Sequence, residues 1–234
     1  MYIDWYYIAL VLPAVLLSMV ASAFVNSTFK KYSKIKNISG VTGAEAARMV
    51  LASKGIYNVS IRPITGDLTD HFNPKTNTIY LSETVYNSTT PAAVGVAAHE
   101  AGHAVQHSEN YLPVKIRTAI VPITNFGASI STVLLVLGLI LSYYGSVFIV
   151  FAYLGVALFG LTTVFQLVTL PTEFNASKRA MIALRESGYF SNDELSSSRK
   201  VLTAAAMTYV AALAVSAMQL LRLFLIVRNN DRRN

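Results

Sequence analysis

The chain carries the stretch AAHEAGHAVQH at residues 97–107, which contains the pattern HExxH. On a helix, residues four apart lie on one face, so His99 and His103 can present two imidazole nitrogens to one metal ion. Glu100 would then lie beside the metal, where its carboxylate can take a proton from a water at the metal, as in a zinc hydrolase. The alternative is a chance match on an alanine-rich helix. The rest of the chain must therefore supply a third ligand, a place for substrate and a suitable location.

The composition indicates a membrane protein with one modest polar domain. Of the 234 residues, 53% are hydrophobic and 13% are charged, a combination that is rare in soluble domains. There is no cysteine, which excludes disulfides, thiolate metal ligands and a cysteine nucleophile. The net charge of +7 does not indicate a nucleic-acid partner, because the basic residues cluster at the ends of apolar stretches, where orientation in a bilayer explains them.

The first apolar stretch runs without charge from Trp5 to Phe29 and is long enough to cross a bilayer. The residues Ala21-Ser22-Ala23 have the form of a signal-peptide cleavage site. Acidic Asp4 precedes the stretch and lysines follow it, however, which reverses the charge order of a signal peptide. We therefore predict an uncleaved transmembrane anchor, residues 1–29, with its basic end in the cytoplasm.

Residues 30–117 are predicted to form a cytosol-facing catalytic domain. Its expected elements are a helix capped by Thr42 over Ala44–Ser53, a strand over Tyr57–Ile64, a loop over Thr69–Asn77, a strand over Thr78–Leu81 and the HExxH helix over about 92–107 after Pro91. The strand Thr78–Leu81 is expected at a sheet edge, where an extended peptide substrate could pair with it.

A second uncharged stretch, Thr118 to Thr172, is long enough for two membrane spans with a turn at 142–146. This predicted transmembrane hairpin, 118–172, returns the chain to the side it left. The segment 173–200 then faces the same compartment as the HExxH helix. Residues 201–234 are predicted to form a last transmembrane helix and a basic tail.

The tail conflicts mildly with the positive-inside rule. Of the nineteen Lys and Arg, only four would lie outside. These are Arg222, Arg228, Arg232 and Arg233. They leave open the alternative that the last helix is only partly inserted.

Two residues near the HExxH pattern are poor third ligands. His107 lies roughly 12 Å along the helix axis from His99, too far for both to reach one ion at about 2 Å. Glu109 has the spacing of a metzincin third ligand, but those enzymes need a glycine three residues after the second histidine, and here Gln106 occupies that position.

Glu173 can complete a His2Glu site. It is expected at a helix start after Pro171, facing the compartment of His99 and His103, and it would leave a fourth position for water. The alternative is an acid that only stabilises a helix N-terminus.

Three segments resemble the YugP-type family of bacterial membrane zinc metallopeptidases: LTDHFNP at 68–74, NTIYLSE at 77–83 and VAAHEAGHAVQH at 96–107. The segment EFNASKRA at 173–180 is more distantly similar to the third-ligand motif of HtpX-type gluzincin proteases. In those relatives an aspartate usually stands four residues after the glutamate and supports the site, whereas here the residue is Ser177.

The resemblance implies an α-helical multi-pass membrane protein, with about four transmembrane helices and a small α+β gluzincin-like metalloprotease domain. It implies a zinc (Zn2+) endopeptidase of the bacterial plasma membrane, with its catalytic side in the cytoplasm and a role in membrane-protein turnover or processing. Zinc would be bound by His99, His103 and Glu173, with Glu100 as general base. Expected partners are a protein or peptide substrate, the lipid bilayer, and a regulatory membrane protein or a second copy of the chain.

His71 is a further candidate, as a donor to the oxyanion or a contact to substrate. Its alternative is a loop histidine that bonds Asp70 or the turn backbone. Two other functions remain open. One is a site-2-type intramembrane protease, but the polar residues on both sides of the HExxH helix leave too short an apolar stretch to span. The other is a catalytically silent adaptor that keeps zinc for folding, but such a site has no use for an unligated base at Glu100.

Overall fold

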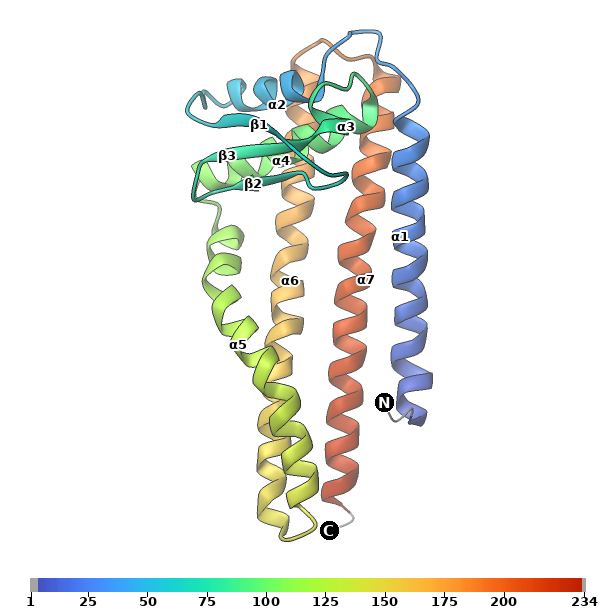
Figure 1. Cartoon of the computed structure of the whole chain (residues 1–234), viewed down its shortest axis with the longest axis vertical. Coiled ribbons are helices and arrows are strands. Elements are labelled where there is room, and N and C mark those ends of the chain that lie inside the picture. Colours follow the sequence, from blue (N-terminus) through green and yellow to red (C-terminus); the bar gives the residue numbers. More distant parts are fainter. Residues whose placement is uncertain (1–3, 233–234) are drawn as a thin grey trace. The chain divides into compact units, whose positions relative to one another are not determined.

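The computed structural model describes residues 4–232, so Arg233 and the outermost ends of the first and last predicted segments lie outside the described residues. Helices dominate, with one small sheet (Figure 1). The elements are the π-helix η1 (Tyr7–Val11), α1 (Leu12–Tyr32), α2 (Gly43–Ala52), β1 (Ser60–Ile64), β2 (His71–Asn73), β3 (Thr78–Ser82), α3 (Glu83–Tyr86), α4 (Pro91–Ser108), α5 (Leu112–Leu141), the 3-10 helix η2 (Ser146–Phe148), α6 (Ile149–Glu186) and α7 (Asn192–Asp231).

Four helical segments are long and apolar enough to cross a membrane: Tyr7–Tyr32, Leu112–Leu141, Ser146–Glu186 and Asn192–Asp231. They confirm the predicted multi-pass helical fold with a small α+β part. The last two helices extend well beyond the uncharged stretches that predicted them. The segment 173–200 is therefore the end of α6, a short loop and the start of α7.

The expectation that Glu173 begins a helix is wrong, because Pro171 lies inside α6 and the helix continues through it. A proline inside a long helix costs one backbone hydrogen bond. Packing of the flanking turns against neighbouring elements can still hold such a helix together. Glu173 lies inside α6, far from the N-terminus of the helix, so its carboxylate cannot interact with the positive end of the helix dipole. The alternative, in which Glu173 only stabilises a helix N-terminus, therefore does not apply.

The chain divides into two compact units. We call residues 4–20, 115–170 and 208–232 the membrane unit, and residues 21–114 and 171–207 the site unit. Long helices contribute residues to both units.

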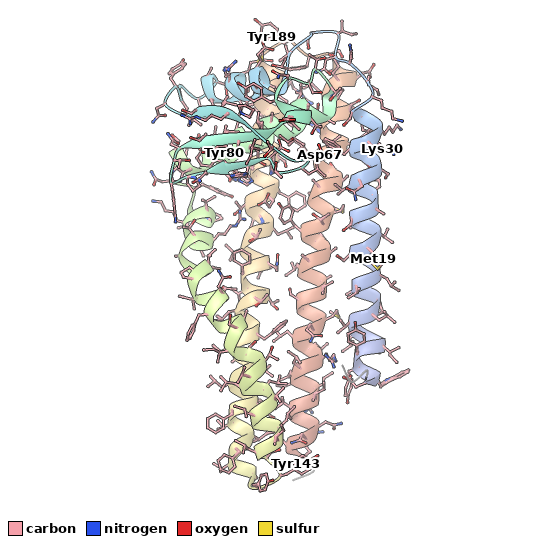
Figure 2. The ribbon with its side chains drawn as sticks, viewed as in Figure 1. Met19, Lys30, Asp67, Tyr80, Tyr143 and Tyr189 are labelled. Atoms are coloured by element: carbon pink, nitrogen blue, oxygen red, sulfur yellow. The ribbon has the colours of Figure 1, made fainter. Side chains whose placement is uncertain are left out.

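In the membrane unit, the turn that carries Tyr143 joins α5 to the following helix (Figure 2). A Cβ on Gly138 of α5 would lie 2.2 Å from the backbone nitrogen of Ala152, so the two backbones are in direct contact there. Close approach at small residues is the usual way that helices associate in lipid. The arms of the predicted hairpin therefore pack directly on each other.

Two polar contacts also hold the membrane unit. The Nε of Arg222 donates to a carboxylate oxygen of Asp4 at 3.0 Å, and the guanidinium lies 5.3 Å from the centre of the Tyr7 ring. Asn230 Nδ2 donates to Ser142 Oγ at 2.8 Å. One of the tail arginines that conflicted with the positive-inside rule thus has an acidic partner.

The sheet of the site unit has the order β1-β3-β2, with β1 parallel and β2 antiparallel to β3. The predicted edge position of Thr78–Leu81 is therefore wrong, because β3 is paired on both sides. The edge strand β2 lies inside the segment that was expected to be a loop. Three residues are too few for an alternating pattern, so only pairing with β3 reveals this strand.

The core of the site unit is built from small and branched side chains. Ile79 and Leu81 of β3 are fully buried, as are alanines of α2 and α4. The buried alanines are Ala46, Ala47, Ala97, Ala98 and Ala101. Thr42 and Glu45 cap α2 reciprocally, which confirms the predicted start of that helix. Small side chains allow α4 to approach its neighbours closely, and this approach positions the site.

Candidate metal centre

The helix α4 begins where its sequence predicts. Pro91 occupies the first turn, and the side chain of Thr90 accepts a hydrogen bond from Ala93 N at 3.3 Å. Further along, a Cβ on Gly102 would lie 2.4 Å from the carbonyl oxygen of Ala176 in α6. Only glycine allows this contact without a shift of one helix. The contact brings the turn of α6 that carries Glu173 against the histidines of α4.

Three donor atoms meet at this contact. His99 Nε2 lies 3.1 Å from His103 Nε2, and Glu173 Oε2 lies 3.2 Å from the first and 3.3 Å from the second. A tetrahedral zinc ion with bonds of about 2.0–2.1 Å separates its ligand atoms by about 3.4 Å. The three atoms therefore surround a space that fits a zinc ion. The side chain of Glu173 is only 3% exposed, against 15% and 16% for the histidines, so an ion would be approached from the histidine side.

The second nitrogen of each histidine also has a polar partner. His99 Nδ1 lies 3.0 Å from Ser177 Oγ, and His103 Nδ1 lies 3.1 Å from Gln106 Oε1. Such contacts hold the ring orientation and leave Nε2 available to a metal. Ser177 thus contacts a histidine from the position where relatives usually have aspartate.

Gln106 is a residue whose role the sequence did not reveal. It is fully buried, and its Nε2 donates to Thr172 O at 2.8 Å and to Asn175 Oδ1 at 3.0 Å. Gln106 therefore links His103 to the residues of α6 on either side of Glu173. The available signal was its spacing, since a polar residue three positions after His103 lies on the same helix face.

Glu109 and His107 do not join the cluster. The carboxylate of Glu109 pairs with the guanidinium of Arg179, which also lies 5.5 Å from the centre of the Tyr111 ring. The ring of His107 lies 5.8 Å from that of Phe72. Their positions agree with the expectation that neither is the third member of a His2Glu group.

Glu100 lies next to the cluster and is partly buried. Its Oε2 accepts a hydrogen bond from the backbone N–H of Phe72 in β2 at 2.9 Å. This contact turns the carboxylate toward the sheet edge and connects the HExxH helix to β2.

His71 lies on β2, outside the cluster, with an exposed side chain. Its Nδ1 lies 2.8 Å from Thr69 O, and its ring stacks on Tyr80 at 5.1 Å, the residue labelled on β3 in Figure 2. The backbone contact is the one expected of a loop histidine. Asp70 bonds Ser82 instead of His71, accepting from the Ser82 backbone N–H at 2.8 Å, and burial raises the pKa of its carboxyl group.

The electrostatics of the cluster favour a cation. Burial acts to lower the pKa of His103, but the hydrogen bond with Glu173 and the charges of Glu100 and Glu173 outweigh it. The pKa of His103 is therefore raised above its ordinary value of 6.5. Carboxylates that hold a proton on this ring in the free site would equally stabilise a metal ion in its place.

Comparison with known proteins agrees with this geometry. A family model described as "Putative neutral zinc metallopeptidase" matches residues 7–228. The "Putative membrane protease YugP" of Bacillus subtilis (strain 168) is 43% identical over 228 residues, covering 97% of this chain and 99% of that protein. No solved structure matches the chain. The match over nearly the full length shows that this chain belongs to the neutral zinc metallopeptidase family.

Proposed function

We propose that this protein is a membrane-embedded zinc endopeptidase of the gluzincin type. His99, His103 and Glu173 are its metal ligands and Glu100 is its general base. The observation that carries the proposal is the triangle of donor atoms, 3.1–3.3 Å apart, with a carboxylate that is not part of the triangle on the adjacent residue of α4.

Three protein ligands leave one position open, which is typical of catalytic zinc. When bound, zinc would supply a Lewis acid that activates water and stabilises negative charge on the carbonyl oxygen of the scissile bond. The residues of this chain hold the metal ligands in position and transfer the proton. Ser177 and Gln106 hold the two rings, and Gln106 also holds the α6 turn that presents Glu173.

Glu100 is placed to move the proton. Its hydrogen bond from Phe72 N–H holds the carboxylate beside the donor triangle, where it can accept a proton from the attacking water. The same carboxyl group can then protonate the leaving amine.

The edge strand β2 is the best position for the substrate backbone. An extended peptide can add to a strand edge with little demand on its sequence, and here it would replace the bond from Phe72 N–H to Glu100. Phe72 on this strand contacts Glu100, so a peptide paired with β2 would lie next to the base. His71 on the same strand remains our candidate for a side-chain donor to the substrate oxygen or a contact to its backbone.

We place the site on the cytoplasmic side of the bacterial plasma membrane, because all but four of the nineteen Lys and Arg then lie inside. Membrane proteins in turnover or processing are the proposed substrates, and a regulatory membrane protein or a second copy could gate access.

The test combines zinc analysis with cleavage of a fluorescently labelled unfolded protein by the purified full-length chain. The wild type should hold one zinc per chain. Glu100→Gln should keep the zinc and lose at least about 100-fold in rate. Glu173→Ala should lose the zinc and the activity together.

Glu83→Gln, at an exposed acid of α3, is the matched control and should change neither quantity. Unaltered cleavage by Glu100→Gln would remove the peptidase proposal, and no cleavage by a zinc-loaded wild type would favour the adaptor. Full zinc retention by Glu173→Ala would remove Glu173 from the ligand set.

A further inference from the structure

A line of polar side chains runs from His103 to the surface of the site unit. His103 Nδ1 lies 3.1 Å from Gln106 Oε1, and Gln106 Nε2 donates to Asn175 Oδ1 at 3.0 Å. The same oxygen of Asn175 accepts a hydrogen bond from Arg179 Nε at 2.6 Å. The line ends at Glu109, whose exposed carboxylate pairs with the guanidinium of Arg179. We call the four residues beyond His103 the Arg179 network.

The donors and acceptors of this network fix its direction. An arginine side chain only donates hydrogen bonds, so Asn175 must turn its oxygen toward Arg179. That oxygen also faces Gln106, which must therefore present its amide nitrogen there. The backbone oxygen of Thr172, 2.8 Å away, makes the same demand on that nitrogen. The oxygen of the Gln106 amide is then left for His103, and it can only accept a hydrogen bond.

This arrangement decides which nitrogen of His103 faces a metal without a proton. The oxygen of Gln106 requires a proton on Nδ1, because two acceptors cannot form a hydrogen bond without one. The lone pair of the neutral ring then lies on Nε2, the atom that faces His99 and Glu173 in the donor triangle. Ser177 makes no such demand on His99, because a hydroxyl can either donate or accept.

We propose that Arg179 is a positioning residue of the metal site, which acts through Asn175 and Gln106. By holding the Gln106 oxygen toward His103, it keeps Nε2 of that ring open to a metal ion. The ion pair with Glu109 holds the guanidinium itself in place. This role presupposes the proposed function, in which His103 is a metal ligand.

The sign of the expected effect separates this role from simple electrostatics. Arg179 carries a positive charge, so its removal by itself would strengthen the binding of a cation. Loss of the network has the opposite effect, because an unsupported ring must be ordered when the metal binds. Glutamine can donate or accept, so Arg179→Gln no longer fixes which way Asn175 turns. It should weaken zinc binding by about threefold to tenfold, less than the loss of a direct partner of the ring.

The experiment combines zinc titration with nuclear magnetic resonance of isotope-labelled histidine in the full-length chain in detergent. In the zinc-loaded protein, the chemical shift and water exchange of each ring N–H proton report its hydrogen bond. Arg179→Gln should shift the Nδ1–H signal of His103 and speed its exchange. The signal of His99, whose partner is Ser177, should stay as in the wild type. A general loss of packing would change both signals.

Two variants of Asn175 test the direction of the network. Asn175→Asp keeps an oxygen toward both neighbours and should bind zinc at least as tightly as the wild type. Asn175→Leu offers no acceptor and should weaken zinc binding by about tenfold. Arg185→Gln, the matched control, removes the same charge from an exposed position further along α6. It should change neither zinc affinity nor the His103 signal.

A double-mutant cycle tests whether Arg179 acts through Gln106. Once Gln106→Met has removed the link to His103, Arg179→Gln should cause no further loss of zinc affinity. Circular dichroism verifies the folding of each variant. If Arg179→Gln does not fold, Glu109→Ala takes its place, because it releases the guanidinium from the exposed side and should shift the His103 signal in the same direction.

Additive losses in the cycle, a gain of zinc affinity in Arg179→Gln, or an unchanged His103 signal would each overturn the role of Arg179 and leave the proposed function standing. Full zinc retention by His103→Ala would instead overturn the proposed function, because His103 would not be a ligand.

Discussion

The two units of this protein distribute their apolar side chains in opposite ways. In the site unit, a cluster of buried aliphatic residues joins α2, β3, α4 and the ends of α6 and α7. Among the described residues of the membrane unit, the buried cluster consists of Ile149, Ala152, Val156 and Val227, while many large apolar side chains face outward. Leu16, Ile123, Phe126, Val133, Ile140 and Leu154 are among these.

The difference reflects two solvents. Burial of apolar surface away from water stabilises the site unit, at about 25 cal/mol per Å². Lipid removes that driving force between helices, so the membrane unit depends on close backbone contact and a few polar bonds. The site unit adds a demand of its own, because its packing must also keep three donor atoms within 3.3 Å of one another.

The sharpest test of this contrast substitutes a glycine at a close helix contact in each unit. Gly102→Ala should force α4 from α6, reduce zinc affinity at least about 100-fold and lower the free energy of unfolding by about 1–3 kcal/mol. Gly138→Ala should destabilise by a similar amount and leave zinc affinity unchanged. Zinc titration and denaturation in detergent measure both, and loss of zinc by Gly138→Ala would break the contrast.

A second test removes a buried polar group from each unit. Gln106→Met keeps the size of the side chain but loses its contacts to His103, Thr172 and Asn175, so zinc affinity should fall by about 10–100-fold. Ser131→Ala removes the hydroxyl of a residue that is 3% exposed and that donates to Ala128 O within α5. It should leave zinc affinity within about twofold of wild type if the support of the site is confined to the site unit.

The third expected effect is a dependence of zinc binding on pH. A proton and a metal ion compete for Nε2 of His103, and the pKa of that ring is raised, so zinc affinity should be full above this pKa and fall by about tenfold per unit as pH drops below it. Glu100→Gln removes one of the charges that raise the pKa. Its profile should shift to lower pH, and an unshifted or oppositely shifted profile would contradict the electrostatic account.

The smallest effect is expected for Asp4→Asn in the membrane unit. It removes the charge of Asp4, whose side chain is 18% exposed against 12% for its partner Arg222, and should lower the free energy of unfolding by no more than about 1–2 kcal/mol, the usual range for polar contacts between membrane helices. Zinc content should not change. A loss of several kcal/mol in a detergent denaturation series would mean that polar bonds, more than packing, stabilise this unit.

The sequence by itself determined features that depend on residues close together in the chain. The spacing of His99, Glu100 and His103 acts within one helix, and the length of an uncharged stretch is enough to predict a span. Topology inferred from those spans also named Glu173, the residue that the structure brings to the two histidines.

Only the tertiary structure decided the contacts that depend on neighbours distant in the chain. Three features were mispredicted: the strand β2, the central place of β3, and the course of α6, which passes through Pro171 instead of starting after it. Two had no prediction at all, the contact of Gly102 with Ala176 and the bonds of Gln106 to Thr172 and Asn175. Each depends on the position of an element that the local sequence does not encode, because the free energy of a close contact is set by both of its partners.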